Sequence, residues 1–433
     1  MSHYSTSSTT PHRPTSLNMT PENFFWATGI EDTFVPQARS GMRPLDEYEL
    51  MGHYEHWRAD LDVARDLGAR AIRWGIPWYR VEPQPGVFDW SWTDQVIPYI
   101  VEELGLELIL DLMHYGTPSW LAGSFIDPDY PQAVAAYARA VAERYGHLLR
   151  YYTPLNEPLV NALNCGQRGV WPPYLRGDSG YVRVMMQLAL GIVATVKAIC
   201  EVDPQALMVH VEATGLSRAA DADLAALVEE DHLRRILSYD LITGRVVPGH
   251  PLLTWLLRNG AQPAHLRALA TDPISLDILG LNFYPQWSTL QLDFDRRGRL
   301  TYRKVEKDGP GFAELIELHY RRYNAPVMIT ETSATGSDRT RAAWLDTSLA
   351  AVRDLRARGV PVIGYTWFPL YTMIDWRYRF GKAPIEQYHL ELGMYRLGDD
   401  GEPRWRPTTL VERFRRAVAD PHGSIGPFVP GEV

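Results

Sequence analysis

Short apolar stretches alternate with longer amphipathic stretches along most of the chain. Eight of the short stretches are rich in β-branched residues or are continuously apolar, which is typical of strands buried on both faces. The pattern therefore predicts strands over residues 24–30, 69–74, 106–112, 151–155, 207–211, 276–283, 327–331 and 360–367.

The stretches between these strands repeat apolar residues at helical spacing. In residues 53–67, Trp57, Leu61 and Ala64 form one stripe, and charged residues take most of the other positions. The same pattern predicts helices over residues 93–104, 131–145, 181–202, 311–323 and 339–358. Residues 217–272 are too long for one strand–helix unit, so we expect extra helices there. Residues 291–309 are polar and charged, which favours a hairpin around Arg297-Gly298.

Eight strands that alternate with helices predict a parallel sheet, and eight is also a number of strands that closes a barrel. An open, doubly wound sheet is the alternative, but no Gly-x-Gly-x-x-Gly motif follows the first strand. We therefore predict an α/β fold, a single (β/α)8 TIM barrel with enlarged loops, over residues 21–420. A disordered leader rich in Ser and Thr would precede it at residues 1–20, and a C-terminal tail would follow at residues 421–433.

The charge balance is mildly acidic, with 43 Lys and Arg against 52 Asp and Glu and a net charge of −9. It gives no basis for nucleic-acid binding, which usually requires a basic patch. The two cysteines cannot form a disulfide framework. The N-terminus lacks the apolar centre of a secretory signal, and no run approaches the roughly 18 apolar residues of a membrane helix. We therefore expect a cytoplasmic protein that binds neither nucleic acid nor membrane. Whether it forms a homo-oligomer stays open.

Aromatic residues are numerous, with 14 Trp and 23 Tyr. Most of these rings must fill the core of a protein of this size. Five tryptophans fall in or after predicted strand ends, namely Trp78, Trp120, Trp171, Trp367 and Trp376. At these positions an indole ring can stack on a flat or ring-shaped ligand.

Polar side chains gather where the predicted strands end, which is the active face of a closed parallel barrel. Glu157 follows the fourth strand, and Glu331 ends the seventh. A pair of carboxyl groups is what glycosidic cleavage needs, because one protonates the leaving oxygen while the other attacks the anomeric carbon or activates water. A gap of about 5–5.5 Å between them predicts retention of configuration, and about 6.5–9.5 Å predicts inversion.

Six segments in the expected order resemble glycoside hydrolase family 1, the β-glucosidases and their relatives in clan A. The central one is Thr-Pro-Leu-Asn-Glu-Pro at residues 153–158, which is similar to the family's Thr-x-Asn-Glu-Pro. The others are residues 57–60 with 67–83, residues 112–118 (Leu-Met-His-Tyr-Gly-Thr-Pro), residues 279–284 (Gly-x-Asn-Tyr-Tyr in the family), residues 329–332 (Thr-Glu-Asn-Gly in the family), and residues 364–367 with 379–381. The resemblance runs from about residue 24 to residue 417.

The resemblance implies a role for each matching residue. Glu157 would be the general acid and base, and Glu331 would be the nucleophile. Arg73 and Tyr284 would hold Glu331 ionised and oriented. The remaining residues would bind the substrate: His114 and Asn156 through sugar hydroxyls, Asn282 at the end of its strand, and Trp367 as the platform under the glycone. The implied enzyme is a retaining β-glycosidase that uses no metal and no organic cofactor on a small carbohydrate substrate.

The chain also departs from the family's pattern at positions where the family recognises the outer hydroxyl groups of the sugar. The family has Gln-x-Glu-Gly after its first strand, whereas this chain has Gly29-Ile30-Glu31-Asp32 and no Gln. After Trp367 the chain is one residue longer than the family and carries Asp375 in place of a sugar-binding Glu. We therefore expect Glu31, Asp375, Trp376 and Arg377 to contribute to a glycone pocket unlike that of typical β-glucosidases. Arg377 and Arg379 could reach an anionic group on the sugar.

Other interpretations of these residues stay open. Asp111 is better read as a buried partner of Arg73 than as a catalytic group. His53 and His56 are spaced as two metal ligands on a helix would be, but no third ligand is in view. For the protein as a whole, a transglycosidase on the same site and a catalytically silent carbohydrate-binding barrel are the alternatives, since fold alone does not decide function.

Overall fold

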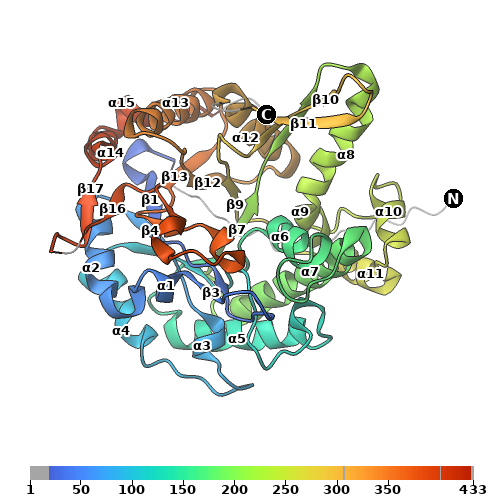
Figure 1. Ribbon diagram of the computed structural model, residues 1–433, viewed down its shortest axis with the longest axis horizontal. Coiled ribbons are helices and arrows are strands. Elements are labelled where there is room, and N and C mark those ends of the chain that lie inside the picture. The colour runs from blue at the N-terminus through green and yellow to red at the C-terminus, as the bar shows by residue number, and fades with distance from the viewer. Residues whose placement is uncertain (1–18, 306–307, 400, 431–433) are drawn as a thin grey trace.

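The computed structural model describes residues 19–305, 308–399 and 401–430. Eight parallel strands form a closed barrel in the order β1-β13-β12-β9-β7-β6-β5-β4, with helices around it (Figure 1). The predicted (β/α)8 barrel is therefore confirmed. Its strands are β1 (Phe25–Gly29), β4 (Ala71–Gly75), β5 (Glu107–Asp111), β6 (Tyr151–Thr153), β7 (Leu207–Ala213), β9 (Ile278–Asn282), β12 (Val327–Thr332) and β13 (Val362–Trp367).

The barrel strands are buried on both faces, as their continuously apolar sequences predict. Every residue of β9, β12 and β13 is buried. Inward side chains such as Ala27, Ala71 and Met328 form a small inner core, while the outward side chains join the large core under the helices. Gly280 allows β9 to lie close to β12, because a Cβ atom there would stand 2.9 Å from Thr330 Cγ2.

The helices match the predicted ones in position, and their ends differ by a few residues. The main helices are α2 (His53–Asp66), α5 (Tyr130–Tyr145), α7 (Gly177–Val202), α12 (Gly309–Tyr323), α13 (Asp338–Ala357) and α14 (Thr409–Ala419). The extra helices expected after β7 are present as α8 (Ala225–Arg235), α9 (Leu237–Ile242), α10 (Leu253–Arg258) and α11 (Pro263–Thr271). Shorter helices are α1 (Glu47–Leu50), α3 (Trp78–Val81) and α6 (Pro158–Asn161).

Two predictions need correction. The helix expected over residues 93–104 splits into α4 (Thr93–Pro98) and a π-helical turn, η2 (Tyr99–Glu103), because Pro98 has no amide hydrogen for the regular helical ladder. The segment expected to be a C-terminal tail begins with a helix, α15 (Pro421–Ile425), whose Ile425 is buried and which packs against α13. Residues 1–18 of the predicted leader lie outside the described residues.

By length and composition, α7 could span a membrane, which contradicts the expectation that no such run exists. In the structure, 72% of its most apolar stretch is buried, and α7 packs along α5 and α9. Its apolar residues are therefore accounted for by contacts within the protein.

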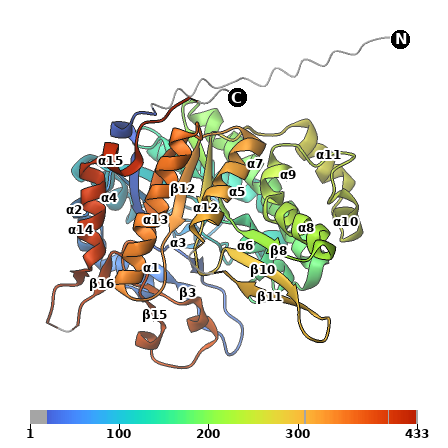
Figure 2. The same ribbon diagram turned by 90° about the horizontal axis from the view of Figure 1, so that it is seen from above.

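Small β-structures extend the carboxyl ends of the barrel strands (Figure 2). The predicted hairpin is confirmed as β10 (Thr289–Phe294) and β11 (Leu300–Lys304), and β8 (Leu216–Ala219) joins it in a three-stranded sheet. Two-stranded ribbons are formed by β2 (Phe34–Val35) with β3 (Leu45–Asp46), by β14 (Met373–Ile374) with β15 (His389–Leu390), and by β16 (Tyr395–Leu397) with β17 (Trp405–Pro407).

Asp60 on α2 connects the first part of the barrel to the end of the chain. Its fully buried carboxylate accepts hydrogen bonds from His53 Nδ1 at 2.8 Å, from Arg404 Nε at 2.7 Å and from Trp405 Nε1 at 2.7 Å. His53 Nε2 in turn accepts a hydrogen bond from Trp74 of β4 at 3.0 Å. One carboxylate therefore fixes α2, β4 and β17 relative to one another.

We predict that D60A lowers the free energy of unfolding by about 3–5 kcal/mol, because it leaves the buried donors of His53, Arg404 and Trp405 without their acceptor. Urea unfolding followed by tryptophan fluorescence measures the change. The matched control is D223A at an exposed position, which should change the free energy by about 0.5 kcal/mol or less. Equal effects of the two substitutions would contradict this account of Asp60.

Candidate active site

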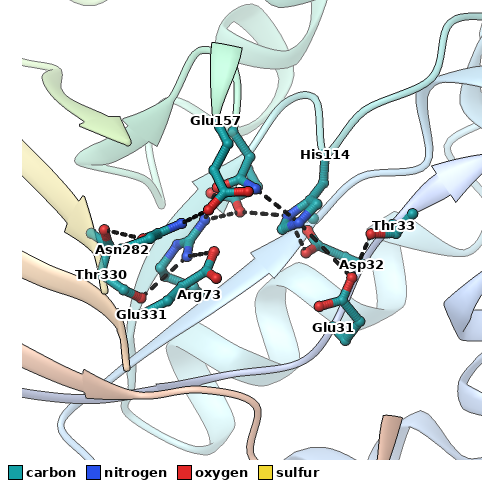
Figure 3. Close-up of polar contacts among 12 residues, drawn as sticks. Glu31, Asp32, Thr33, Arg73, His114, Glu157, Asn282, Thr330 and Glu331 are labelled. Carbon is teal, nitrogen blue, oxygen red and sulfur yellow. Dashed lines mark hydrogen bonds and ion pairs between the residues drawn. The ribbon is translucent and has the colours of Figure 1, made fainter. Parts of the chain in front are cut away.

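Glu157 stands at the turn between β6 and α6, and its backbone adopts a left-handed conformation with φ +46°. A non-glycine residue in that region is uncommon and tends to mark a functional position. Pro158 follows it, which disfavours the ordinary helical conformation at residue 157. The carboxyl group accepts a hydrogen bond from Asn282 Nδ2 on Oε1 at 2.8 Å (Figure 3). Its Oε2 accepts a hydrogen bond from the Tyr115 hydroxyl.

Glu331 lies near the end of β12, where the pairing of this strand shifts register against both of its neighbours. Such a shift changes the direction in which a side chain points. Glu331 Oε1 accepts a hydrogen bond from Arg73 Nη1 at 2.7 Å, and Oε2 accepts one from the Tyr284 hydroxyl at 2.6 Å. Both oxygens are thus held, so the carboxylate has one fixed orientation.

The two carboxyl groups have different electrostatic surroundings. Burial raises the pKa of Glu157 to about 7, and the negative charge of Glu331 acts in the same direction, while the hydrogen bonds from Tyr115 and Asn282 act against the rise. Glu331 instead contacts the guanidinium group of Arg73 directly. One carboxyl group can therefore carry a proton near neutral pH while the other faces a fixed cation.

Arg73 is the centre of a buried polar network. Its Nη2 donates to Asp111 Oδ2 at 2.5 Å and to Asn156 Oδ1 at 3.1 Å, which confirms Asp111 as its partner. Asn282 connects Glu157 to β12, because its Nδ2 donates to Glu157 while its Oδ1 accepts a hydrogen bond at 2.7 Å from the hydroxyl of Thr330, the residue before Glu331.

His114 lies beside this network with carboxyl groups on one side. Its Nδ1 is 2.6 Å from Asp32 Oδ1, and its Nε2 is 2.9 Å from Asn156 Nδ2 and 3.9 Å from Glu31 Oε1. Burial alone would lower the pKa of His114, but the charges of Asp32 and Glu31 and the hydrogen bond with Asp111 raise it well above its usual value.

Glu31 and Asp32 are buried carboxyl groups at the end of β1. Burial raises the pKa of Glu31 to about 7 and that of Asp32 to about 6, and the charge of His114 opposes the rise in both. Glu31 Oε1 accepts a hydrogen bond from Thr33 Oγ1 at 2.5 Å.

The ligand atoms of Asp32, Asp111 and His114 lie within 4.8 Å of one another, as they would around a metal ion. Arg73 already binds Asp111 Oδ2, and His114 Nδ1 lies 2.6 Å from Asp32 Oδ1, so side chains of the protein already occupy both carboxyl groups. This arrangement favours an internal ion-pair cluster over a metal site. At His53 both ring nitrogens are occupied by Asp60 and Trp74, which argues against the metal pair with His56.

A cavity of about 490 Å³ opens over these groups. Its catalytic end is lined by Glu31, His114, Tyr115, Glu157, Tyr284 and Glu331. Its lining also includes five apolar side chains, Leu159, Val160, Leu163, Trp287 and Leu290, and two cations, Arg168 and Arg235. Residues of the segment after β13 also line it, namely Met373, Asp375, Trp376, Leu390 and Leu392. The size suits a small-molecule ligand.

The structure brings together most of the residues predicted from the sequence. Arg73, His114, Asn156, Asn282 and Tyr284 contact one another or the two glutamates as described above. Trp376 lines the cavity and packs its ring against those of Tyr115 and Trp171, with centroid distances of 5.4 and 5.1 Å.

Four residues that were predicted to bind the substrate lie differently from what was expected. Trp367 is fully buried and does not line the cavity; its Nε1 donates to the Leu392 carbonyl at 3.0 Å. Asp375 lines the cavity, but Arg377 Nε and Nη2 both bind its Oδ2, at 2.9 and 2.7 Å. The Arg377 side chain itself is 83% exposed. Arg379, which was expected to reach an anionic sugar group, is buried and donates to the carbonyls of Val35, Arg43 and Gln37.

Sequence analysis missed two contributors to this site. Tyr115 follows His114 directly, yet an aromatic residue at a strand end reads as core. Phe368 lies over Gly29, where a Cβ atom would come within 2.6 Å of Phe368 Cδ2. The absence of a Gln at this end of β1 was visible in the sequence, but only the fold shows that an aromatic ring fills the space.

Comparisons with known proteins identify a family and related enzymes. The model of glycosyl hydrolase family 1 matches residues 28–286, which include Glu157 but end before Glu331. β-Glucosidase A of Thermotoga maritima is 22% identical over 363 residues, which cover 76% of this chain and 80% of that protein. A β-glucosidase of an Agrobacterium species is 23% identical over 372 residues, which cover 77% of this chain and 80% of that protein.

Solved structures extend the similarity of fold to nearly the whole chain. The family 1 β-glucosidase of Thermotoga maritima superimposes with a TM-score of 0.80 and 20% identity, over 93% of this chain and 98% of that one. Its complex with glucoimidazole gives the same score at 19% identity, again over 93% and 98% of the two chains. With the family model matching more than half of the sequence, the chain belongs to glycosyl hydrolase family 1 and is a glycoside hydrolase.

Proposed function

We propose that the protein is a retaining β-glycosidase that acts through a glycosyl-enzyme intermediate. The observation that carries the proposal is the pair of carboxyl groups on one cavity with opposite surroundings: Glu157 is buried with a raised pKa, and both oxygens of Glu331 are held by Arg73 and Tyr284. Membership of the family and β-glucosidases among the relatives support a β-linked carbohydrate substrate.

In the first step, a carboxylate oxygen of Glu331 attacks the anomeric carbon while Glu157 gives its proton to the glycosidic oxygen, and the bond to the aglycone breaks. Formation of the ester removes the charge of Glu331, which lowers the pKa of Glu157 and prepares it to act as a base. In the second step, Glu157 takes a proton from water, the water oxygen attacks the same carbon, and Glu331 is released.

The glycone pocket is proposed to differ from that of typical β-glucosidases. Phe368 fills the space above Gly29, Arg377 engages Asp375, and Trp367 is buried behind the cavity wall. Each difference removes or covers a group that the family resemblance assigns to sugar binding. Two alternatives are tested by further experiments. Product analysis with added sugar acceptors tests transglycosylation, in which an acceptor replaces water. Binding of a β-glycoside without release of its aglycone would indicate a catalytically silent protein.

The first prediction concerns the nucleophile. E331G should lower kcat on an activated aryl β-glycoside by at least about 10³-fold, because the covalent step loses its nucleophile. Azide should restore turnover by entering the space left by the carboxylate, and the product should be the α-glycosyl azide. Full activity of E331G without azide would show that Glu331 is not the nucleophile.

The second prediction concerns the acid. If Glu157 donates the proton, kcat/KM should fall as the pH rises through the pKa of Glu157, near 7. The Tyr115 hydroxyl stabilises the charged form of Glu157, so Y115F should raise this pKa and move the alkaline limb upward by about 0.5–1 pH unit.

The matched control is Y137F, which removes a buried hydroxyl that donates to the Leu112 carbonyl and lies outside the cavity lining. Its alkaline limb should coincide with that of the unmodified enzyme. An unchanged or lowered limb in Y115F would contradict the assignment of Glu157.

A further inference from the structure

Glu212 is a buried carboxyl group that the mechanism above does not use. It lies on β7, one residue before the end of the strand, and is 1% exposed. Its Oε1 accepts hydrogen bonds from the amides of Leu159 at 3.0 Å and Ala213 at 2.9 Å. Its Oε2 accepts a hydrogen bond from the Ser238 hydroxyl. Glu212 therefore connects β7 to α6 and to α9.

The turn that carries Glu157 is attached to the barrel through backbone amides. Those of Asn156, Glu157 and Leu159 donate to the Met113 carbonyl at 2.8 Å, the Val211 carbonyl at 3.1 Å and Glu212 Oε1 at 3.0 Å, respectively. Pro158, between the last two donors, has no amide hydrogen. The bond from Leu159 to Glu212 thus fixes the turn on the side that follows Glu157.

The turn needs attachment on both sides because the backbone of Glu157 is left-handed, with φ +46°. Such a conformation is unfavourable for a residue other than glycine and persists only where the surrounding contacts fix it. Within the turn, the Asn161 amide donates to the Glu157 carbonyl at 3.1 Å, but that bond moves with α6. The bonds to β7 are therefore the ones that place the Glu157 side chain relative to the barrel.

Glu212 is itself held in place by α9. The hydroxyl of buried Ser238 on this helix binds its Oε2. The next residue, Tyr239, donates its hydroxyl hydrogen bonds to the carbonyls of His210 at 2.9 Å and Gly280 at 3.0 Å, which fixes α9 on β7 and β9. The carboxyl group of Glu212 consequently has a defined position behind the turn.

The surroundings of Glu212 favour its neutral form. Burial raises the pKa of Glu212 to about 8, and the charge of Glu157 acts in the same direction, while the hydrogen bonds from Ser238, Leu159 and Ala213 oppose the rise. A neutral carboxyl group still has an oxygen that accepts both amides. Glutamine has the same shape and keeps such an oxygen, so it is the conservative replacement.

We propose that Glu212 is a positioning residue for Glu157: by holding the Leu159 amide, it keeps the acid and base carboxyl group within reach of the glycosidic oxygen. This inference rests on the proposed function, because it takes Glu157 as the proton donor. Glu212 does not belong to the cavity lining, so it acts through the turn and not on the substrate. A misplacement of about 1 Å at a reacting group can cost on the order of 10²-fold in rate.

Dependence on the leaving group distinguishes a misplaced acid from a general loss of structure. Phenol needs a proton from Glu157 to depart, whereas 2,4-dinitrophenolate departs without one. E212M removes the acceptor at similar side-chain size, and it should lower kcat/KM for the phenyl β-glycoside on the order of 10²-fold and that for the 2,4-dinitrophenyl β-glycoside by less than about threefold. The glycone is D-glucose, D-galactose or D-fucose, whichever the unmodified enzyme hydrolyses best.

Three further variants accompany E212M. E212Q should stay within about threefold of the unmodified enzyme on both substrates, because it keeps the acceptor oxygen. E212D withdraws the carboxyl group by one methylene and should split the two substrates in the same direction as E212M. E82M is the matched control, since buried Glu82 likewise accepts hydrogen bonds from a backbone amide and an indole, those of Gly86 at 2.7 Å and Trp78 at 2.6 Å. E82M should change both substrates by the same factor.

Equal factors on the two substrates in E212M and E212D, or in whichever of them shows the circular dichroism of the intact fold, would overturn the proposal. A split in E212Q as large as that in E212M would overturn it as well, because the acceptor oxygen would then be irrelevant.

Azide separates this inference from the proposed function. In E212M the glycosyl ester on Glu331 lacks a well-placed base to activate water. Azide needs no base, so it should attack the anomeric carbon, release the Glu331 carboxylate, raise kcat on the dinitrophenyl substrate and give the β-glycosyl azide. Turnover by the unmodified enzyme without this azide product in E212M would refute the role of Glu212 alone. No release of aglycone by the unmodified enzyme from any of these glycosides would refute the glycosidase and the inference together.

Discussion

The buried guanidinium of Arg73 is the constraint on which the site depends. It is 1% exposed and binds Asp111, Asn156, Glu331 and the Thr330 carbonyl, so it joins residues from β4, β5 and β12 and from the turn after β6. Removing such a charge from water costs several kcal/mol, which only close anionic partners can offset. The closed barrel supplies these partners, because its strand ends converge on one face.

The same cation makes the two glutamates different. Arg73 and Tyr284 hold both oxygens of Glu331, while Glu157 receives its hydrogen bonds from the neutral groups of Tyr115 and Asn282. Because burial and the neighbouring negative charge both raise the pKa of Glu157, it can keep a proton near neutral pH. The contact of Arg73 with Glu331 and the burial of Glu157 together distinguish the candidate nucleophile from the candidate acid.

The barrel fold and the convergence of the polar side chains on one face could be predicted from the sequence because both depend on local patterns, whereas the catalytic roles were implied by the family resemblance. Continuously apolar strands alternate with amphipathic helices, and Arg73, His114, Glu157, Tyr284 and Glu331 each stand at or near a strand end. A barrel brings such positions together whatever their separation in sequence.

The glycone pocket could not be predicted, because it depends on contacts between distant segments. Trp367 is covered because β15 returns and Leu392 accepts its indole hydrogen bond. The contact of Arg377 with Asp375 is local, and it depends on a 3-10 helical turn that the apolar pattern does not specify. Pro98 is visible in the sequence and indicates the split between α4 and η2. The helical periodicity of the residues around it nevertheless led to the prediction of one continuous helix.

The central claim is that Glu331 forms a covalent glycosyl-enzyme while Glu157 serves first as acid and then as base. The stereochemistry of hydrolysis tests it most directly, by proton NMR of the sugar in the first minutes after an aryl β-glycoside is added. The account predicts that the β-anomer appears first and that the α-anomer grows in only through mutarotation. Initial release of the α-anomer would mean a single displacement by water and would contradict the account.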